Sequence, residues 1–93
     1  MIEIYELLQN QFLQLEEDKE NLQKEIKICK ANIKTYEKIR NLVIKVNGDT
    51  TEQINKIKDE TEEIEKITNE LNKIRLKRKN LNKMVLLIEE VMW

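Results

Sequence analysis

The sequence lacks the residues on which most enzyme chemistry depends. It has no histidine and no serine in 93 residues, and it has a single cysteine. The usual base and nucleophile of acyl transfer are therefore missing. One thiol without an imidazole or a second sulfur also offers neither a transition-metal site nor an intrachain disulfide. These absences predict a protein that is not an enzyme and that binds no metal or cofactor.

Proline is absent and glycine occurs once, at position 48. A single glycine cannot build a phosphate-binding loop. Gly48 is expected to take the left-handed backbone conformation that ends a helix, with Asn47 the next most tolerant residue. Asp49 then stands at a helix N-cap, with Glu52 three residues on to complete a capping box. The sequence thus predicts a helix at 2–46, a turn at 47–49 and a helix at 50–91. The apolar run at 42–46 also suits a short strand, but no matching strand follows Asp49.

Aromatic residues and long apolar runs are also scarce. Aromatic residues make up 4% of the chain and charged residues 38%, which suits long exposed helices better than a globular core. The net charge of -1 gives no bulk attraction to nucleic acid or anionic lipid. The longest apolar run, at 84–88, is far shorter than the roughly 20 residues of a membrane span. Because the start of the chain has no basic n-region, we expect a cytoplasmic protein with no signal peptide.

What the chain does contain is two heptad seams, in which apolar residues recur at alternating spacings of three and four. The first seam consists of Tyr5, Leu8, Phe12, Leu15, Leu22, Ile26, Cys29, Ile33 and Tyr36, with Lys19 at one polar position. We expect it to continue through Ile39, Val43 and Val46, which drops one residue and bypasses Arg40. The second seam consists of Ile54, Ile57, Thr61, Ile64, Ile67, Leu71, Ile74, Arg78, Leu81, Val85, Ile88 and Met92. Between Thr61 and Ile67 it has two successive spacings of three, one residue fewer than the heptad requires.

Charge blocks predict that the two helices fold back on one another. Residues 1–20 and 58–70 are net acidic, whereas residues 21–40 and 71–93 are net basic. An antiparallel hairpin places opposite blocks together, and a shifted register opposes like charges. The acidic group Glu16, Glu17, Asp18 and Glu20 is then expected beside Lys77, Arg78 and Lys79. The basic group Lys30, Lys34 and Lys38 is expected beside Asp59, Glu60, Glu62, Glu63 and Glu65. Lys19 is expected to face Arg78 as a polar layer that fixes register.

The two chain ends carry more apolar residues than one seam can bury. Such a surplus usually marks an association surface. We predict an interface formed by Ile2, Ile4, Tyr5, Leu8, Phe12, Leu86, Leu87, Val91 and Trp93. Its simplest use is a homodimer that joins two such ends into a four-helix bundle. Another protein could occupy the same surface, and frayed ends are the plainer alternative.

Two other features have a structural and a functional interpretation. Cys29 lies in the first seam, which indicates core packing rather than a redox role. The basic run Lys73, Arg75, Lys77, Arg78, Lys79 and Lys83 is interrupted by no acidic residue, so it is a candidate phosphate-binding set. The acidic block of the first helix is expected to pair with it instead.

We therefore predict an all-α antiparallel coiled-coil hairpin that serves as an adaptor, assembly factor or stoichiometric inhibitor. The alternative is a helical nucleic-acid-binding module that uses residues 73–83.

Overall fold

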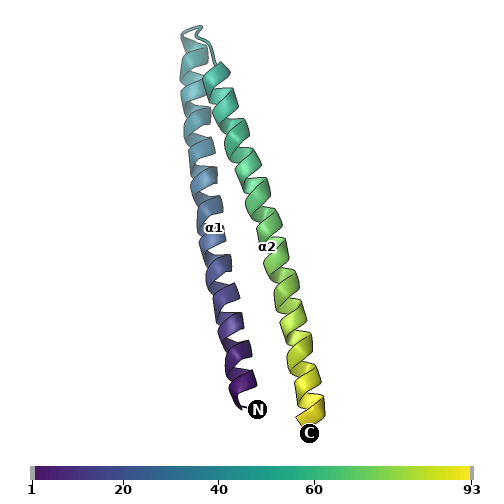
Figure 1. Ribbon diagram of the computed structural model, residues 1–93. Coiled ribbons are helices and arrows are strands. Elements are labelled where there is room, and N and C mark those ends of the chain that lie inside the picture. The colour runs from purple at the N-terminus through teal and green to yellow at the C-terminus, as the bar shows by residue number, and fades with distance from the viewer. Residues whose placement is uncertain (1, 93) are drawn as a thin grey trace. The chain divides into compact units, whose positions relative to one another are not determined.

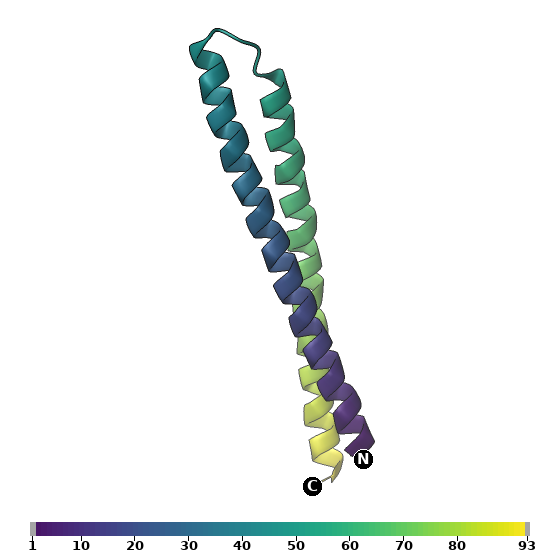
Figure 2. The same ribbon diagram turned by 90° about the vertical axis from the view of Figure 1, so that its left-hand side faces the viewer.

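The computed structural model describes the backbone of residues 2–92 and the side chains of residues 3–91. It contains two α-helices, α1 (Ile2–Lys45) and α2 (Thr51–Met92), which pack against each other (Figures 1 and 2). Within residues 2–92 there is no strand, so the helical interpretation of residues 42–46 holds up to Lys45. The predicted helix boundaries at 2, 46, 50 and 91 lie within one residue of the observed ones, a difference within the usual fraying of helix ends.

The chain divides into two compact units. The turn unit is Gln23–Asn69, a hairpin that contains the end of α1, the turn and the start of α2. The terminal unit is the described part of Met1–Leu22 with Glu70–Trp93, in which the beginning of α1 lies beside the end of α2 (Figures 1 and 2). Cys29 and Ile67 are the buried core of the turn unit, and Leu8 and Leu81 are the buried core of the terminal unit. All four belong to the predicted seams.

The end of α1 is closed by a Schellman motif, in which the residue after the C-cap is left-handed. The left-handed residue is Asn47, with φ of 56°, and not Gly48 as predicted. The Asn47 N–H donates to the Ile44 carbonyl at 3.0 Å, and the Gly48 N–H donates to the Val43 carbonyl at 2.9 Å. Gly48 is needed for a different reason, because a Cβ there would lie 2.8 Å from Val43 Cγ1. The glycine therefore permits a close approach to the last turn of α1.

The start of α2 is capped by Asp49. Its Oδ1 accepts hydrogen bonds from the Thr51 backbone N–H at 2.9 Å and from the Thr51 hydroxyl. The hydroxyl bond, and then the backbone bond, hold the pKa of the Asp49 carboxyl below its ordinary value. Among the hydrogen bonds of the described residues none joins Asp49 to Glu52, so the predicted capping box is not formed. Thr51 supplies both contacts instead.

Both seams keep an unbroken heptad, which corrects the predicted irregularities. Near the turn, Arg40 is half-buried while Ile39 is 39% exposed and Val46 is 77% exposed. On α2, Gln53 and Glu60 are half-buried, whereas Ile54 is 51% exposed and Thr61 is exposed. The sequence prediction followed the apolar residues, but the two packed helices keep a steady period of 3.5 residues. A long charged side chain such as Arg40 is tolerated in the seam because its stem packs while its head reaches solvent.

Candidate docking site

The terminal unit uses part of the predicted interface to hold its own two helices together. Leu8 is only 5% exposed, and Tyr5 and Phe12 are half-buried. These three residues occupy seam positions of α1, which face α2 in the same chain. The prediction that Leu8 contributes an open surface is therefore wrong, and Tyr5 and Phe12 contribute at most their edges.

The other predicted interface residues remain open to solvent. Ile4 is 42% exposed and Leu86, Leu87 and Val91 are 61%, 60% and 82% exposed. The Ile2 side chain and Trp93 lie outside the part of the chain that the structure describes. Met84, at 49% exposure, was not in the predicted set. Its spacing of three residues before Leu87 would have placed it on the same helix face.

An apolar groove lies at the end of the terminal unit. It has a volume of about 300 Å³ and is lined by Ile4 from α1 and by Leu87, Ile88 and Val91 from α2. The lining contains no polar side chain that could orient a small ligand, which is what small-molecule pockets normally provide. Such a groove can accept apolar side chains of another helix.

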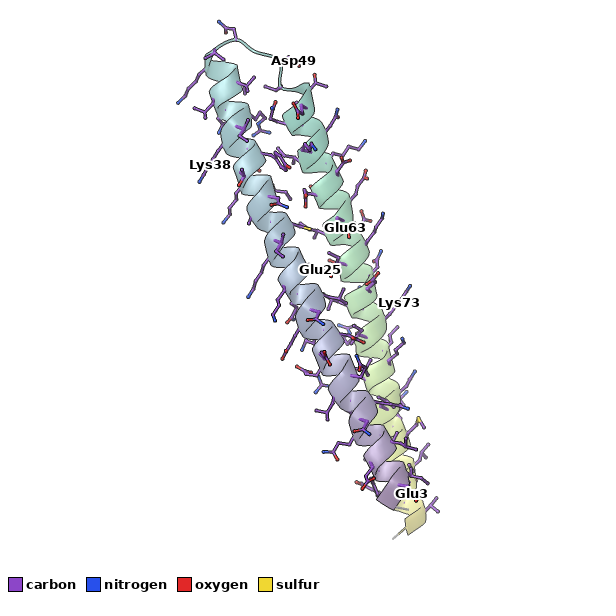
Figure 3. All side chains as sticks on the ribbon, turned by 60° about the vertical axis from the view of Figure 1, so that its left-hand side comes forward. Glu3, Glu25, Lys38, Asp49, Glu63 and Lys73 are labelled. Atoms are coloured by element: carbon purple, nitrogen blue, oxygen red, sulfur yellow. The ribbon has the colours of Figure 1, made fainter. Side chains whose placement is uncertain are left out.

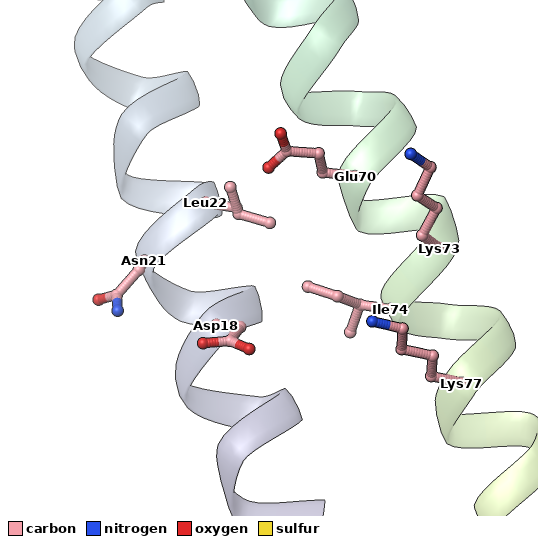
Figure 4. A pocket seen from close by; sticks show the side chains of 7 residues that line it. All are labelled: Asp18, Asn21, Leu22, Glu70, Lys73, Ile74 and Lys77. Atoms are coloured by element: carbon pink, nitrogen blue, oxygen red, sulfur yellow. The ribbon is translucent and has the colours of Figure 1, made fainter.

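Two further grooves on the terminal unit have mixed linings. One is lined by Gln11, Gln14, Leu15, Asp18, Lys77, Asn80 and Leu81. The other is lined by Asp18, Asn21, Leu22, Glu70, Lys73, Ile74 and Lys77 (Figure 4). In Figure 4, Leu22 and Ile74 point toward each other across the space between the helices. Leu22 with Ile74, and Leu15 with Leu81, thus confirm the predicted register to within one residue.

One ion pair joins the two helices of the terminal unit. Arg78 Nη1 donates to Glu16 Oε2 at 3.1 Å, with the two side chains 51% and 45% exposed. This contact confirms that the acidic block of α1 lies beside the basic block of α2. Arg78 bonds to Glu16, and Lys19, the residue predicted to face Arg78, is half-buried on the next turn of α1. At this exposure the pair contributes only about 0.2–1 kcal/mol, so it supports the register without dominating stability.

The basic run on α2 does not form a single face. Residues four apart, such as Lys73 and Lys77, share a side of a helix, and both line the groove in Figure 4 with Asp18 and Glu70. Arg75, Lys79 and Lys83 fall on another side by the same periodicity. An array of phosphates along one direction would not meet all six basic residues at once.

In the turn unit, the carboxylate of Glu60 lies beside Cys29 at the seam. Figure 3 shows two further acidic residues of this unit, Glu25 on α1 and Glu63 on α2. Asn32 Nδ2 donates to Glu60 Oε1 at 3.3 Å, and Cys29 is 7% exposed. Burial, a hydrogen bond with Glu60 and the negative charges of Glu60, Glu63 and Glu25 raise the pKa of the Cys29 thiol. The prediction of core packing for Cys29 is confirmed. Within the described residues, no ion pair joins the lysines of residues 30–38 to the acidic block at 59–65.

No protein-family model, no curated protein and no solved structure matches this chain. No helix in residues 2–92 is long and apolar enough to cross a membrane. Within the same residues, no cluster of three or more acidic, thiol or imidazole groups is placed to hold a metal ion. The docking interpretation therefore depends on the geometry of the terminal unit.

Proposed function

We propose that this chain is a non-enzymatic coiled-coil interaction protein that docks through the apolar end of its terminal unit. The observation that carries the proposal is the groove lined by Ile4, Leu87, Ile88 and Val91, together with the exposed Leu7 and Met84 beside it. Solvent-exposed apolar side chains that adjoin one another are costly to leave in water and typically mark a contact surface.

The groove suits a helical partner. Its walls come from two antiparallel helices, and a further helix or helix pair laid against them completes a bundle. One more copy as the partner gives a four-helix bundle, and a helix of a different protein gives an adaptor, assembly factor or inhibitor complex. Both forms bury the same residues.

A photoreactive residue tests the proposal directly. Benzoylphenylalanine in place of Leu87 should cross-link, on irradiation in the cells that naturally express the chain, to one discrete protein. The matched control is the same replacement at Leu86, which is the neighbouring leucine, is equally exposed and does not line the groove. Discrete cross-links from position 87 and not from position 86 support the docking site. Identical patterns from both positions, or none from either, would remove its basis.

A further inference from the structure

We propose that the occupant of the groove is a second copy of this chain, packed side by side so that α1 of each copy lies against α2 of the other. The proposal rests on the proposed function and narrows it, because it names the partner and the face. That face, the groove face, follows one stripe along each helix of the terminal unit.

The groove face is defined by residues that recur every three or four positions. On α1 the stripe is Ile4, Leu7, Gln11, Gln14, Asp18 and Asn21. On α2, read in the opposite direction, it is Val91, Leu87, Met84, Asn80, Lys77 and Lys73. Ten of these twelve residues line one of the three grooves, and Leu7 and Met84 fall on the same stripes by helical spacing. Asp18 is half-buried and the other eleven are exposed.

The chemistry of the groove face changes in the same order on both helices. Ile4 and Leu7 match Val91 and Leu87 at the apolar end, and Gln14 matches Asn80 in the middle. Asp18 then lies level with Lys77, since both line the same two grooves. Four of the six levels thus hold two apolar groups, two amides, or one acid and one base, and the other two set Gln11 level with Met84 and Asn21 level with Lys73.

This matching makes the face complementary to itself. A two-fold axis parallel to the helices brings α1 of one copy opposite α2 of the other while keeping every level unchanged. At four levels apolar residues then meet apolar residues, Gln14 meets Asn80, and each Asp18 meets a Lys77 of the other copy. At the other two levels Gln11 meets Met84 and the Asn21 amide meets Lys73. All neighbouring helices in the resulting bundle are antiparallel, as in the up-down four-helix bundle. An axis perpendicular to the helices, at full overlap, would instead set Ile4 and Val91 against Asn21 and Lys73.

The other side of the terminal unit already carries a charged contact within one chain. There the Glu16–Arg78 ion pair already joins the helices. On the same side, α1 carries the acidic Glu20 and α2 carries the basic Lys79. Leu13 and Leu86 are exposed on that side, but they do not line any of the grooves described above. The groove face is therefore the side on which a second copy packs.

The area of the face favours overlap along the whole terminal unit. The apolar end spans about two helical turns, so two helices, each about 10 Å wide, give a footprint of only about 200 Å². Stable interfaces bury roughly 800 Å² per partner. Extending the contact to Asp18 and Lys77, and on to Asn21 and Lys73, lengthens it to about 30 Å and gives a footprint of about 600 Å². Packed side chains bury more than the flat footprint, so the whole face reaches the size of a stable interface.

Two charge-reversal variants of the full chain test the arrangement. Asp18→Lys alone sets the new ammonium group against Lys77 of the other copy, and Lys77→Glu alone sets the new carboxylate against Asp18 of the other copy. Each variant by itself should dimerise about 10-fold more weakly than the unaltered chain. Mixed together, the two variants restore an acid–base pair at both contacts between copies, while each chain keeps its own internal mismatch. Native mass spectrometry of the mixture should therefore show heterodimer in excess of both homodimers.

Sedimentation equilibrium with matched apolar variants gives the second measurement. Leu87→Glu should weaken dimerisation by about 100-fold or more, because a symmetric interface buries the new charge twice. Leu86→Glu, at the adjacent exposed position, should change it by less than about threefold. Asn80→Glu should weaken dimerisation, and Asn82→Glu, on the other side of α2, should not. A chain that stays monomeric at about 100 μM, equal effects at positions 86 and 87, or a mixture without excess heterodimer overturns the inference.

These outcomes separate the inference from the proposed function. A monomeric chain whose position 87 still cross-links to a different protein would reject the second copy and retain the docking site. Loss of both the cross-link and the dimer would reject both.

Discussion

At the scale of single residues, three neighbouring residues of the turn each have a separate structural role. Asn47 supplies the left-handed backbone, Gly48 supplies the close approach to Val43, and Asp49 caps α2 through Thr51. The left-handed region costs an ordinary L-residue roughly 1–2 kcal/mol, and asparagine is among the few residues that reduce this cost.

Replacing Asn47 by alanine and replacing it by glycine should have different effects on the free energy of unfolding. Asn47→Ala is expected to lower the free energy of unfolding by about 1 kcal/mol, because alanine retains a Cβ and loses the asparagine side chain. Asn47→Gly should leave the free energy unchanged or raise it by a few tenths of a kcal/mol, since glycine is the preferred residue at this position. Urea denaturation followed by circular dichroism measures both. Equal losses for the two variants would contradict the assignment of Asn47 as the left-handed residue.

The cap at Asp49 should be visible in its titration. Because its folded-state pKa is depressed, the cap stabilises the fold above the ordinary carboxyl value of about 3.9, and this stabilisation is lost as the pH falls through the lowered value. Carboxyl ¹³C NMR should place the midpoint for Asp49 below that of an ordinary aspartate. Thr51→Ala should move it upward by removing the hydroxyl bond, whereas Thr50→Ala should not. A midpoint unaffected by Thr51→Ala would show that the hydroxyl does not hold the carboxylate.

At the scale of the helices, the sequence predicted most of the architecture. The turn position, the helix boundaries to within one residue and the antiparallel register follow from one glycine, two heptad patterns and four charge blocks. The details near the turn did not follow, because Ile39 and Ile54 are more apolar than Arg40 and Gln53. Local hydrophobicity favours the isoleucines, but seam membership is decided by the phase of the whole helix. Only the packed pair reveals that phase.

Gln53 marks a place where the seam is not optimal. Its Oε1 is buried without a hydrogen-bond partner, which costs about 1–3 kcal/mol. Gln53→Leu should therefore raise the free energy of unfolding by about 1–2 kcal/mol, as a seam leucine also adds apolar burial. Gln23→Leu, at an exposed position of α1, is the control and should change it by less than about 0.5 kcal/mol. Chemical denaturation checks both, and a loss of stability in Gln53→Leu would show that the amide has an unseen stabilising role.

Cys29 should behave as an inert core thiol. The raised pKa means that the folded chain holds less thiolate at pH 8 than a free cysteine does, and the thiolate is the nucleophile. With Ellman's reagent at pH 8, the folded protein is expected to react at least 10-fold more slowly than the same chain in urea. The rate should rise with pH and with denaturant. Reaction as fast as that of a free thiol would mean that the turn unit opens readily around this residue.

At the scale of the whole molecule, the candidate site was predicted in part. The sequence identified a surplus of apolar residues at the chain ends, including Ile4, Leu87 and Val91. It could not decide which of them the chain would bury itself, so Leu8 was wrongly assigned to the open surface and Met84 was omitted. The division of residues between an internal seam and an external face depends on how the two helices are rotated about their axes, and composition does not encode that rotation.

Salt dependence should separate the two functional hypotheses. An interface that is mainly apolar with one pair of charge contacts should change its dissociation constant by less than about 10-fold between 50 and 500 mM salt. Contact with nucleic acid through residues 73–83 would instead weaken by orders of magnitude over a similar range. Sedimentation of the protein alone and anisotropy of a labelled oligonucleotide, at the same two salt concentrations, make the comparison. A steep salt response of self-association would contradict an apolar groove.

Ile4 and Val91 line one groove although they come from opposite ends of the chain. A bulky label attached at Ile4 or at Val91 would therefore occupy the same groove, so labels on two distant parts of the sequence would disturb one and the same contact.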